Sequence, residues 1–169
     1  VALGLVATSA HVGAGTTSLE LRPPDGDPVS GAVVAFDPKV DLALVRTGLR
    51  RPVLPLAAPT DGDRGLVMGY PGGGRLDPSP FELGEQLDAR GYDIYDSGTV
   101  DRELLVLASD LAPGDSGSAV VRADGSVIGV AVAIAPDRPG VAYALDEAQL
   151  QRLVAAPHGD PGSTGPCLR

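Results

Sequence analysis

The chain has 169 residues, a length that suits a single domain. Hydrophobic residues make up 43% of it, so a sizeable core is available, and 22 acidic against 13 basic residues give a net charge of -9. Because this acidic balance supplies no basic face, nucleic-acid binding is excluded as a main function. The longest apolar run, residues 127–135, is far shorter than the about 20 residues that a membrane-spanning helix needs.

Short apolar segments with a period of two predict strands along most of the chain. They lie at residues 17–22, 31–36, 42–45, 53–57, 66–70, 104–108, 118–122, 127–135 and 141–145. Turn sequences separate them, in keeping with a content of Gly 23 and Pro 16. Many short strands with turns at this spacing predict an all-β sandwich or barrel.

Two regions depart from the strand pattern. Residues 75–99 are long and polar, and they predict a loop-rich excursion with a short strand or turn. Near the C-terminus, Asp146 is placed to cap a helix over residues 147–155, and Pro157 ends it. The tail that follows is rich in Gly, Pro and Ser, so we expect it to have little structure of its own.

The sharpest chemical signal is the segment Gly114-Asp115-Ser116-Gly117-Ser118. A serine nucleophile needs an exposed turn and two backbone N–H groups directed at the developing oxyanion, and flanking glycines permit that close approach. The N–H groups of Gly114 and Ser116 would form this oxyanion hole. The same residues also suit a surface turn before a strand, which is the alternative.

A base for such a serine must be a histidine, and the chain has only His11 and His158. His158 lies in the polar tail, which indicates a solvated residue. His11 follows an apolar segment and a run of small residues, so it fits either a catalytic base or a partly buried core histidine.

The carboxylate that orients the base is predicted at Asp41, which opens the apolar segment 42–45. Burying a carboxylate without a partner is costly, and a histidine N–H would satisfy it. The rival Asp37 precedes a proline and indicates a turn residue. The order His11, Asp41, Ser116 is that of chymotrypsin, and it differs from the orders of α/β-hydrolases and subtilisin.

These residues resemble the conserved blocks of trypsin-like serine proteases. Thr8-Ser9-Ala10-His11 is similar to their Thr-Ala-Ala-His, Asp41-Leu42-Ala43-Leu44 to Asp-Ile-Ala-Leu, Gly114-Asp115-Ser116-Gly117 to Gly-Asp-Ser-Gly-Gly, and Pro139-Gly140-Val141 to the block that closes the specificity pocket. The compact spacing resembles bacterial HtrA-type proteases. Gly69–Gly74, Tyr92–Tyr95 and the late Cys167 resemble the MarP type, which comprises actinobacterial membrane-anchored periplasmic proteases linked to acid resistance.

The resemblance implies the chymotrypsin fold, with two antiparallel β-barrels, a cleft between them and a C-terminal helix. Few residues precede His11, so the first barrel is expected to be N-terminally incomplete in this chain. The implied division of the single protease domain 1–169 is a first barrel over about 1–60, a second over about 61–145, the helix at 146–156 and a tail at 157–169.

The resemblance also assigns roles. Ser116 is the nucleophile, His11 the general acid and base and Asp41 its orienter, with Gly114 and Ser116 as the oxyanion hole. Asp115 matches an acidic residue that steadies the active-site loop in many relatives. Two departures are Ser118, where the family has a second glycine, and Val132, where many relatives have a serine that bonds the aspartate.

The implied substrate pocket has walls at Val132, Ala133 and Ile134 on one side and near Gly140 on the other. Because these side chains are apolar, we expect a preference for small or medium apolar residues at P1, such as Leu or Ala. A counter-signal is Asp110, which lies six residues before Ser116, where trypsin-type enzymes carry their pocket acid.

We therefore expect a serine endopeptidase that acts on proteins or peptides, working outside the cytoplasm in stress or acid resistance and anchored by a membrane segment outside this chain. The alternative is an inactive protease-fold module that binds peptides. Two histidines and one cysteine offer no metal-ligand cluster, and no cofactor is expected. In an exported protein Cys167 would pair with a cysteine upstream of Val1, and the alternative is a free thiol.

Overall fold

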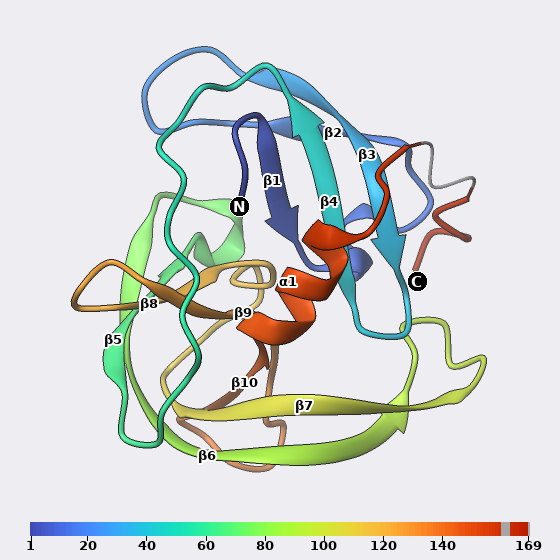
Figure 1. The fold of residues 1–169 in the computed structure, drawn as a ribbon. Helices are drawn as coiled ribbons and strands as arrows, with labels where there is room; N and C mark the ends of the chain where they lie inside the picture. Colours follow the sequence, from blue (N-terminus) through green and yellow to red (C-terminus); the bar gives the residue numbers. More distant parts are fainter. Residues whose placement is uncertain (160–162, 169) are drawn as a thin grey trace.

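The structure is a computed structural model that describes residues 1–159 and 163–168, and it contains two β-structures of different closure (Figure 1). The first is a four-stranded antiparallel sheet in the order β1-β4-β3-β2. Its strands are β1 (Leu5–Thr8), β2 (Ser18–Leu21), β3 (Val29–Asp37) and β4 (Leu42–Thr47). β1 and β2 lie at its two edges, so this sheet is open, which agrees with the incomplete first barrel that the sequence predicts.

The second β-structure is a closed barrel in the order β10-β7-β6-β5-β8-β9. Its strands are β5 (Arg64–Gly69), β6 (Asp77–Tyr92), β7 (Thr99–Ala108), β8 (Ala119–Arg122), β9 (Val127–Ile134) and β10 (Val141–Asp146). Closure leaves this barrel without a free sheet edge. The prediction of an all-β chain with a C-terminal helix is confirmed.

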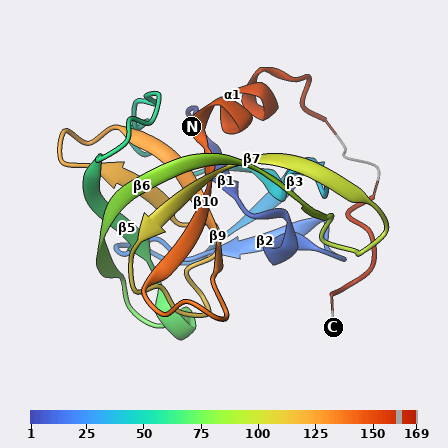
Figure 2. The ribbon, with the colours of Figure 1, turned by 90° about the horizontal axis from the view of Figure 1, so that it is seen from below.

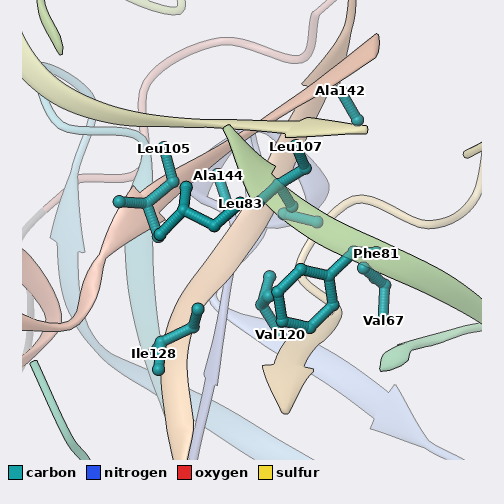
Figure 3. Packing of buried hydrophobic residues seen from close by; sticks show 10 residues of the cluster. Val67, Phe81, Leu83, Leu105, Leu107, Val120, Ile128, Ala142 and Ala144 are labelled. Atoms are coloured by element: carbon teal, nitrogen blue, oxygen red, sulfur yellow. The ribbon is translucent and has the colours of Figure 1, made fainter. Parts of the chain in front are cut away.

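Two apolar clusters stabilise the fold, one inside the barrel and one between the open sheet, the barrel and the helix. The barrel interior is filled by aliphatic side chains around a single aromatic ring, as Figure 3 shows: Val67, Phe81, Leu83, Leu105, Leu107, Val120, Ile128, Ala131, Ala142 and Ala144. A second cluster joins the open sheet to the barrel and the helix: Val34, Leu42, Leu44, Val130, Leu145 and Leu150. Full burial of one Leu or Phe side chain stabilises the fold by about 1.5–3 kcal/mol, so the second cluster contributes much of the attachment of the sheet.

The C-terminal helix α1 (Glu147–Ala155) begins and ends as the sequence predicts. The Asp146 carboxylate accepts a hydrogen bond from the backbone N–H of Gln149 at 2.9 Å, which satisfies a free donor of the first turn. Leu150 is buried and anchors the helix, which lies across β4, β9 and β10 (Figure 1). Of the predicted tail 157–169, residues 160–162 and 169 lie outside the described part, and 163–168 contain no helix or strand.

Two predictions of local structure were wrong, one of a strand and one of a loop-rich segment. Residues 53–57 form an extended connection, with only an isolated bridge between Leu56 and Val127. Pro52 and Pro55 lack the N–H groups that a strand ladder would use. Conversely, residues 75–99 are not loop-rich, because β6 runs for 16 residues, pairing with β5 over residues 77–82 and with β7 over residues 82–92. Its polar appearance arises because most of its side chains alternate between a buried or half-buried face and a solvent face.

Within the described residues, no helix is both long enough and apolar enough to cross a membrane.

Candidate active site

The two sheet residues of the predicted triad meet because their strands are neighbours. β1 and β4 pair with Thr8 opposite Ala43, so the end of β1 and the start of β4 lie together. His11 follows β1 in the short 3-10 helix η1 (Ala10–Gly13), and Asp41 directly precedes β4. The Asp41 carboxylate lies 2.8 Å from Nδ1 of the His11 ring and also accepts the His11 backbone N–H at 2.9 Å. One carboxylate therefore holds both the ring and the backbone of the histidine.

Asp41 adopts a backbone conformation that is rare for a residue with a side chain, with φ at 69°. Such a conformation costs about 1–3 kcal/mol and persists only where its surroundings enforce it. Here the Asp41 N–H donates to the carbonyl of Asp37 at 2.9 Å, and its carbonyl accepts from Ala10 N at 3.2 Å. The Asp37 carboxylate accepts the N–H groups of Lys39 and Val40, so Asp37 is the turn residue that the sequence predicts.

The His11 ring is open to solvent on one side, whereas its partner is covered. The side chain of His11 is 29% exposed and that of Asp41 is 11% exposed. An acceptor at Nδ1 fixes the ring so that Nδ1 carries the proton and Nε2 is left free. Nε2 can thus accept a proton from a neighbouring group.

Ser116 lies in a tight loop between β7 and β8 that is held by Asp115. The Asp115 side chain accepts the N–H of Ala112 at 2.8 Å, and its backbone N–H donates to the Ala112 carbonyl at 3.1 Å. Asp115 is only 4% exposed, and its other carboxylate oxygen has no hydrogen-bond partner among the described residues. The loop is therefore shaped by a buried acid directly beside the serine.

Two backbone N–H groups of this loop are free to bind an anion. The Pro113 carbonyl accepts the N–H of Gly72 at 2.7 Å. Because C=O and N–H point in opposite directions across a trans peptide, the N–H of Gly114 faces away from Gly72. Within the described part of the chain, the hydrogen bonds include none donated by the N–H of Gly114 or of Ser116. Such a pair beside a serine hydroxyl is the arrangement that stabilises a tetrahedral oxyanion.

The serine loop packs against the residues that lead to His11. The Ala131 carbonyl accepts both the Gly117 N–H, at 2.8 Å, and the Ser9 hydroxyl, at 3.3 Å. A Cβ on Gly117 would lie 2.3 Å from Oγ1 of Thr8, so only glycine fits there. The structure gives no hydrogen bond between the described side chains of Ser116 and His11; in unliganded hydrolases this contact is often long and tightens with substrate.

A cavity of about 220 Å³, open to solvent, lies beside Ser116. One wall is formed by Ala131, Val132, Ala133 and Ile134 of β9, and the other by Leu111, Ala112 and Pro113. The sequence analysis missed Leu111, whose place in this wall depends on its packing against the barrel core.

Asp110 and Gly140 are absent from the described lining of this cavity, so the wall expected near Gly140 is formed by the 111–113 segment. The Asp110 carboxylate lies toward Gly140, 3.5 Å from where a Cβ on that glycine would be.

The remaining candidates lie elsewhere. His158 is half-buried, and its Nε2 lies 3.1 Å from the carbonyl of Leu153 behind the helix. Cys167 is an exposed free thiol. Among residues 1–159 and 163–168, no group of His, Cys, Asp and Glu side chains could hold a metal ion.

The sequence and the fold are similar to those of known proteins. The sequence model of the trypsin-like peptidase domain matches residues 1–130. The serine protease Rv3671c of Mycobacterium tuberculosis (strain ATCC 25618 / H37Rv) is 33% identical over 168 residues, which covers 96% of this chain and 42% of the relative. The chain thus spans less than half the length of this curated relative.

The crystal structure of the active form of the Rv3671c protease from M. tuberculosis matches with a TM-score of 0.92 and 30% identity, over 98% of this chain and 75% of that one. An inactive form of the same protease matches with a TM-score of 0.78 and 32% identity, over 90% of this chain and 78% of that one. The HtrA-type protease AlgW, solved with a decapeptide, matches with a TM-score of 0.75 and 26% identity, over 92% of this chain and 49% of that one.

Proposed function

The chain belongs to the trypsin-like peptidase family of serine proteases, and from that premise we propose that it hydrolyses peptide bonds through an acyl-enzyme on Ser116. His11 takes the hydroxyl proton through Nε2 as Ser116 attacks the scissile carbonyl. It then returns this proton to the leaving amine. A water molecule, activated by the same histidine, releases the acyl group.

The observation that carries this proposal is the double contact of Asp41 with His11, through the ring at 2.8 Å and the backbone N–H at 2.9 Å. It holds the imidazole in the tautomer that a base needs and stabilises the imidazolium that forms during attack. A histidine that served only packing would have no need of a carboxylate held in a left-handed conformation.

The oxyanion that forms on the substrate carbonyl binds to the N–H groups of Gly114 and Ser116. Donors of this kind act where charge develops, and removing one typically costs about 10²–10³ in kcat. The closer overall match to the active form of the Rv3671c protease, with a TM-score of 0.92 against 0.82 and 0.78 for two inactive forms, supports an active arrangement of the fold.

We assign the cavity between β9 and the 111–113 segment to the P1 side chain of the substrate. Its Leu, Ala, Val, Pro and Ile walls favour a small or medium apolar residue, because the one charged lining residue, Asp115, is buried and its carboxylate is bound to the Ala112 N–H. The substrates are therefore proteins or peptides with residues such as Leu or Ala before the cleaved bond.

The setting of the enzyme is also part of the proposal. The resemblance to MarP-type proteases and the similarity to Rv3671c support an extracytoplasmic protease of stress or acid resistance, anchored through a segment outside this chain. Cys167, exposed and single in the sequence, is proposed to pair with a cysteine of such a segment.

Labelling with a fluorophosphonate probe, together with hydrolysis of a peptide library, tests the reaction. The wild-type protein should react at Ser116 and cleave peptides, and Ser116→Ala should do neither while keeping its melting temperature. Loss of a nucleophile typically costs about 10⁶ in kcat. The matched control is Ser18→Ala on β2, because this exposed serine is far from the cavity.

A wild-type protein that binds peptides but neither labels nor cleaves would contradict the proposal and favour the inactive binding module.

A further inference from the structure

The β6–β7 hairpin reaches from the closed barrel to the open sheet. Its tip, residues 93–98, joins the end of β6 to the start of β7, and in both views it lies beside the C-terminal tail (Figures 1 and 2). Within the tip, Asp93 accepts the backbone N–H groups of Tyr95 and Ser97 at 2.8 and 3.0 Å. Hydrogen bonds from the Ser97 hydroxyl and N–H also hold the pKa of Asp93 below its usual value. The tip is thus a defined turn around a charged carboxylate.

This hairpin contacts the turn that precedes Asp41. Nε of Arg102 on β7 donates to the Lys39 carbonyl at 2.7 Å, and the Ile94 N–H donates to the Pro38 carbonyl at 3.2 Å. Arg102 also donates from Nη2 to the Tyr92 carbonyl at 2.9 Å, so one guanidinium ties the hairpin to residue 39. The bond from Arg102 to Lys39 joins residues that are 63 positions apart in the sequence.

The same tip also reaches the segment that follows His11. The Tyr95 hydroxyl donates to the Thr164 carbonyl, which accepts the backbone N–H of Gly15 as well, at 3.1 Å. The Tyr95 ring packs directly on Gly165, since a Cβ there would lie 2.4 Å from the ring. Gly15 lies two residues beyond the end of η1, which carries His11. Residues 164–165 of the tail therefore link the hairpin to the segment after His11. The 38–39 turn links the same hairpin to Asp41.

We propose that Arg102 is a positioning residue for catalysis, acting through the Lys39 carbonyl on Asp41 and so on His11. This inference rests on the proposed function, in which Ser116 belongs to the barrel whereas His11 and Asp41 belong to the open sheet. Attack requires the two β-structures to keep their relative placement, and a misplacement of about 1 Å can cost about 10²-fold in rate. The hairpin fixes that placement at the turn beside the strained Asp41.

The test compares Arg102→Gln with Arg90→Gln in steady-state hydrolysis of a peptide substrate. Arg90 is the matched control, because it is an exposed arginine on the same hairpin whose one ion pair, among the described residues, is with Asp101 at 4.0 Å. Arg102→Gln should lower kcat about tenfold with KM changed less than about twofold. Arg90→Gln should match the wild type. Arg102→Lys, which keeps a donor toward the Lys39 carbonyl, should recover part of the loss and serves if the glutamine variant does not fold.

A double-mutant cycle with Asp41→Asn separates positioning from general loosening of the fold. If Arg102 acts through Asp41, adding Arg102→Gln to the Asp41→Asn protein should lower kcat on an activated ester by less than about twofold. The inference is overturned if Arg102→Gln equals Arg90→Gln, if Arg102→Lys recovers nothing, or if the loss is the same with and without the Asp41 carboxylate. A wild-type protein that neither labels nor cleaves would instead overturn the proposed function.

Discussion

Replacing Gly114 with alanine is expected to disable the oxyanion hole while the nucleophile and its base stay in place. Gly114 has φ at +106°, a backbone region that residues with a side chain rarely adopt. A Cβ there would lie 2.6 Å from the nitrogen of Gly72 and 2.8 Å from the carbonyl oxygen of Tyr70. Both neighbours are backbone atoms of the adjacent loop, so relief requires the 113–114 peptide to move.

The expected fall in kcat depends on the hydrogen bond that this movement breaks. The Pro113 carbonyl is held by Gly72 N at 2.7 Å, and this bond keeps the Gly114 N–H turned away from Gly72. A rotated peptide loses the donor, which predicts a fall in kcat of about 10²–10³, equivalent to about 3–4 kcal/mol. The backbone conformation adds a stability cost of about 1–3 kcal/mol.

The matched control is Gly125→Ala in the β8–β9 turn. Gly125 also has a positive φ, +84°, but a Cβ there would meet nothing within 4 Å. The Gly125→Ala protein should lose about 1–2 kcal/mol of stability and keep its peptidase activity. Peptide hydrolysis and thermal unfolding of both variants give the answer, and a Gly114→Ala protein with kcat within about threefold of Gly125→Ala would refute the assignment of the oxyanion hole.

Three further predictions concern specificity, pH and the thiol. A peptide-library profile should show small or medium apolar P1 residues, and a profile dominated by Arg or Lys that Asp110→Ala abolishes would contradict the apolar pocket. Burial, followed by the neighbouring Asp146, raises the pKa of Glu147 above 4.5, so the folded protein holds this proton more tightly than the unfolded chain and gains stability as pH falls through the raised value. Glu147→Gln should therefore raise the melting temperature at pH 7. It should also make the rise in melting temperature from pH 7 to about pH 5 smaller than in the wild type. If this rise is the same in both proteins, Glu147 is not responsible for it. Mass spectrometry of the longer, unreduced protein should find Cys167 in a disulfide with a cysteine upstream of Val1, and a freely alkylated Cys167 would exclude it.

Strands could be predicted from the sequence where both of their faces are buried or where turn residues mark their ends, because these signals lie within the segment itself. Residues 42–45 and 127–134 are apolar almost throughout, and the structure places them in β4 and β9. β6 was missed because its exposed face is charged and because Pro78 and Pro80 argue against a ladder. Its inward residues Phe81 and Leu83 pack in the barrel core, a contact that tertiary pairing decides.

The residues of the candidate site also differ in how far the sequence could predict them. His11, Asp41 and Ser116 lie in short local motifs, so they could be named from residue type and chain order. Leu111 and Arg102 could not, because their significance depends on what faces them across the fold. Nothing near Arg102 in the sequence indicates the Lys39 carbonyl, which lies 63 positions away.

The placement of the triad residues on two β-structures bears on how activity is lost when the protein unfolds. Proteins open locally and sub-globally in contiguous units, each with its own free energy of opening. The open sheet carries His11 and Asp41, whereas the barrel carries Ser116. Opening of either unit therefore separates the base from the nucleophile, so a partly unfolded molecule has no complete triad.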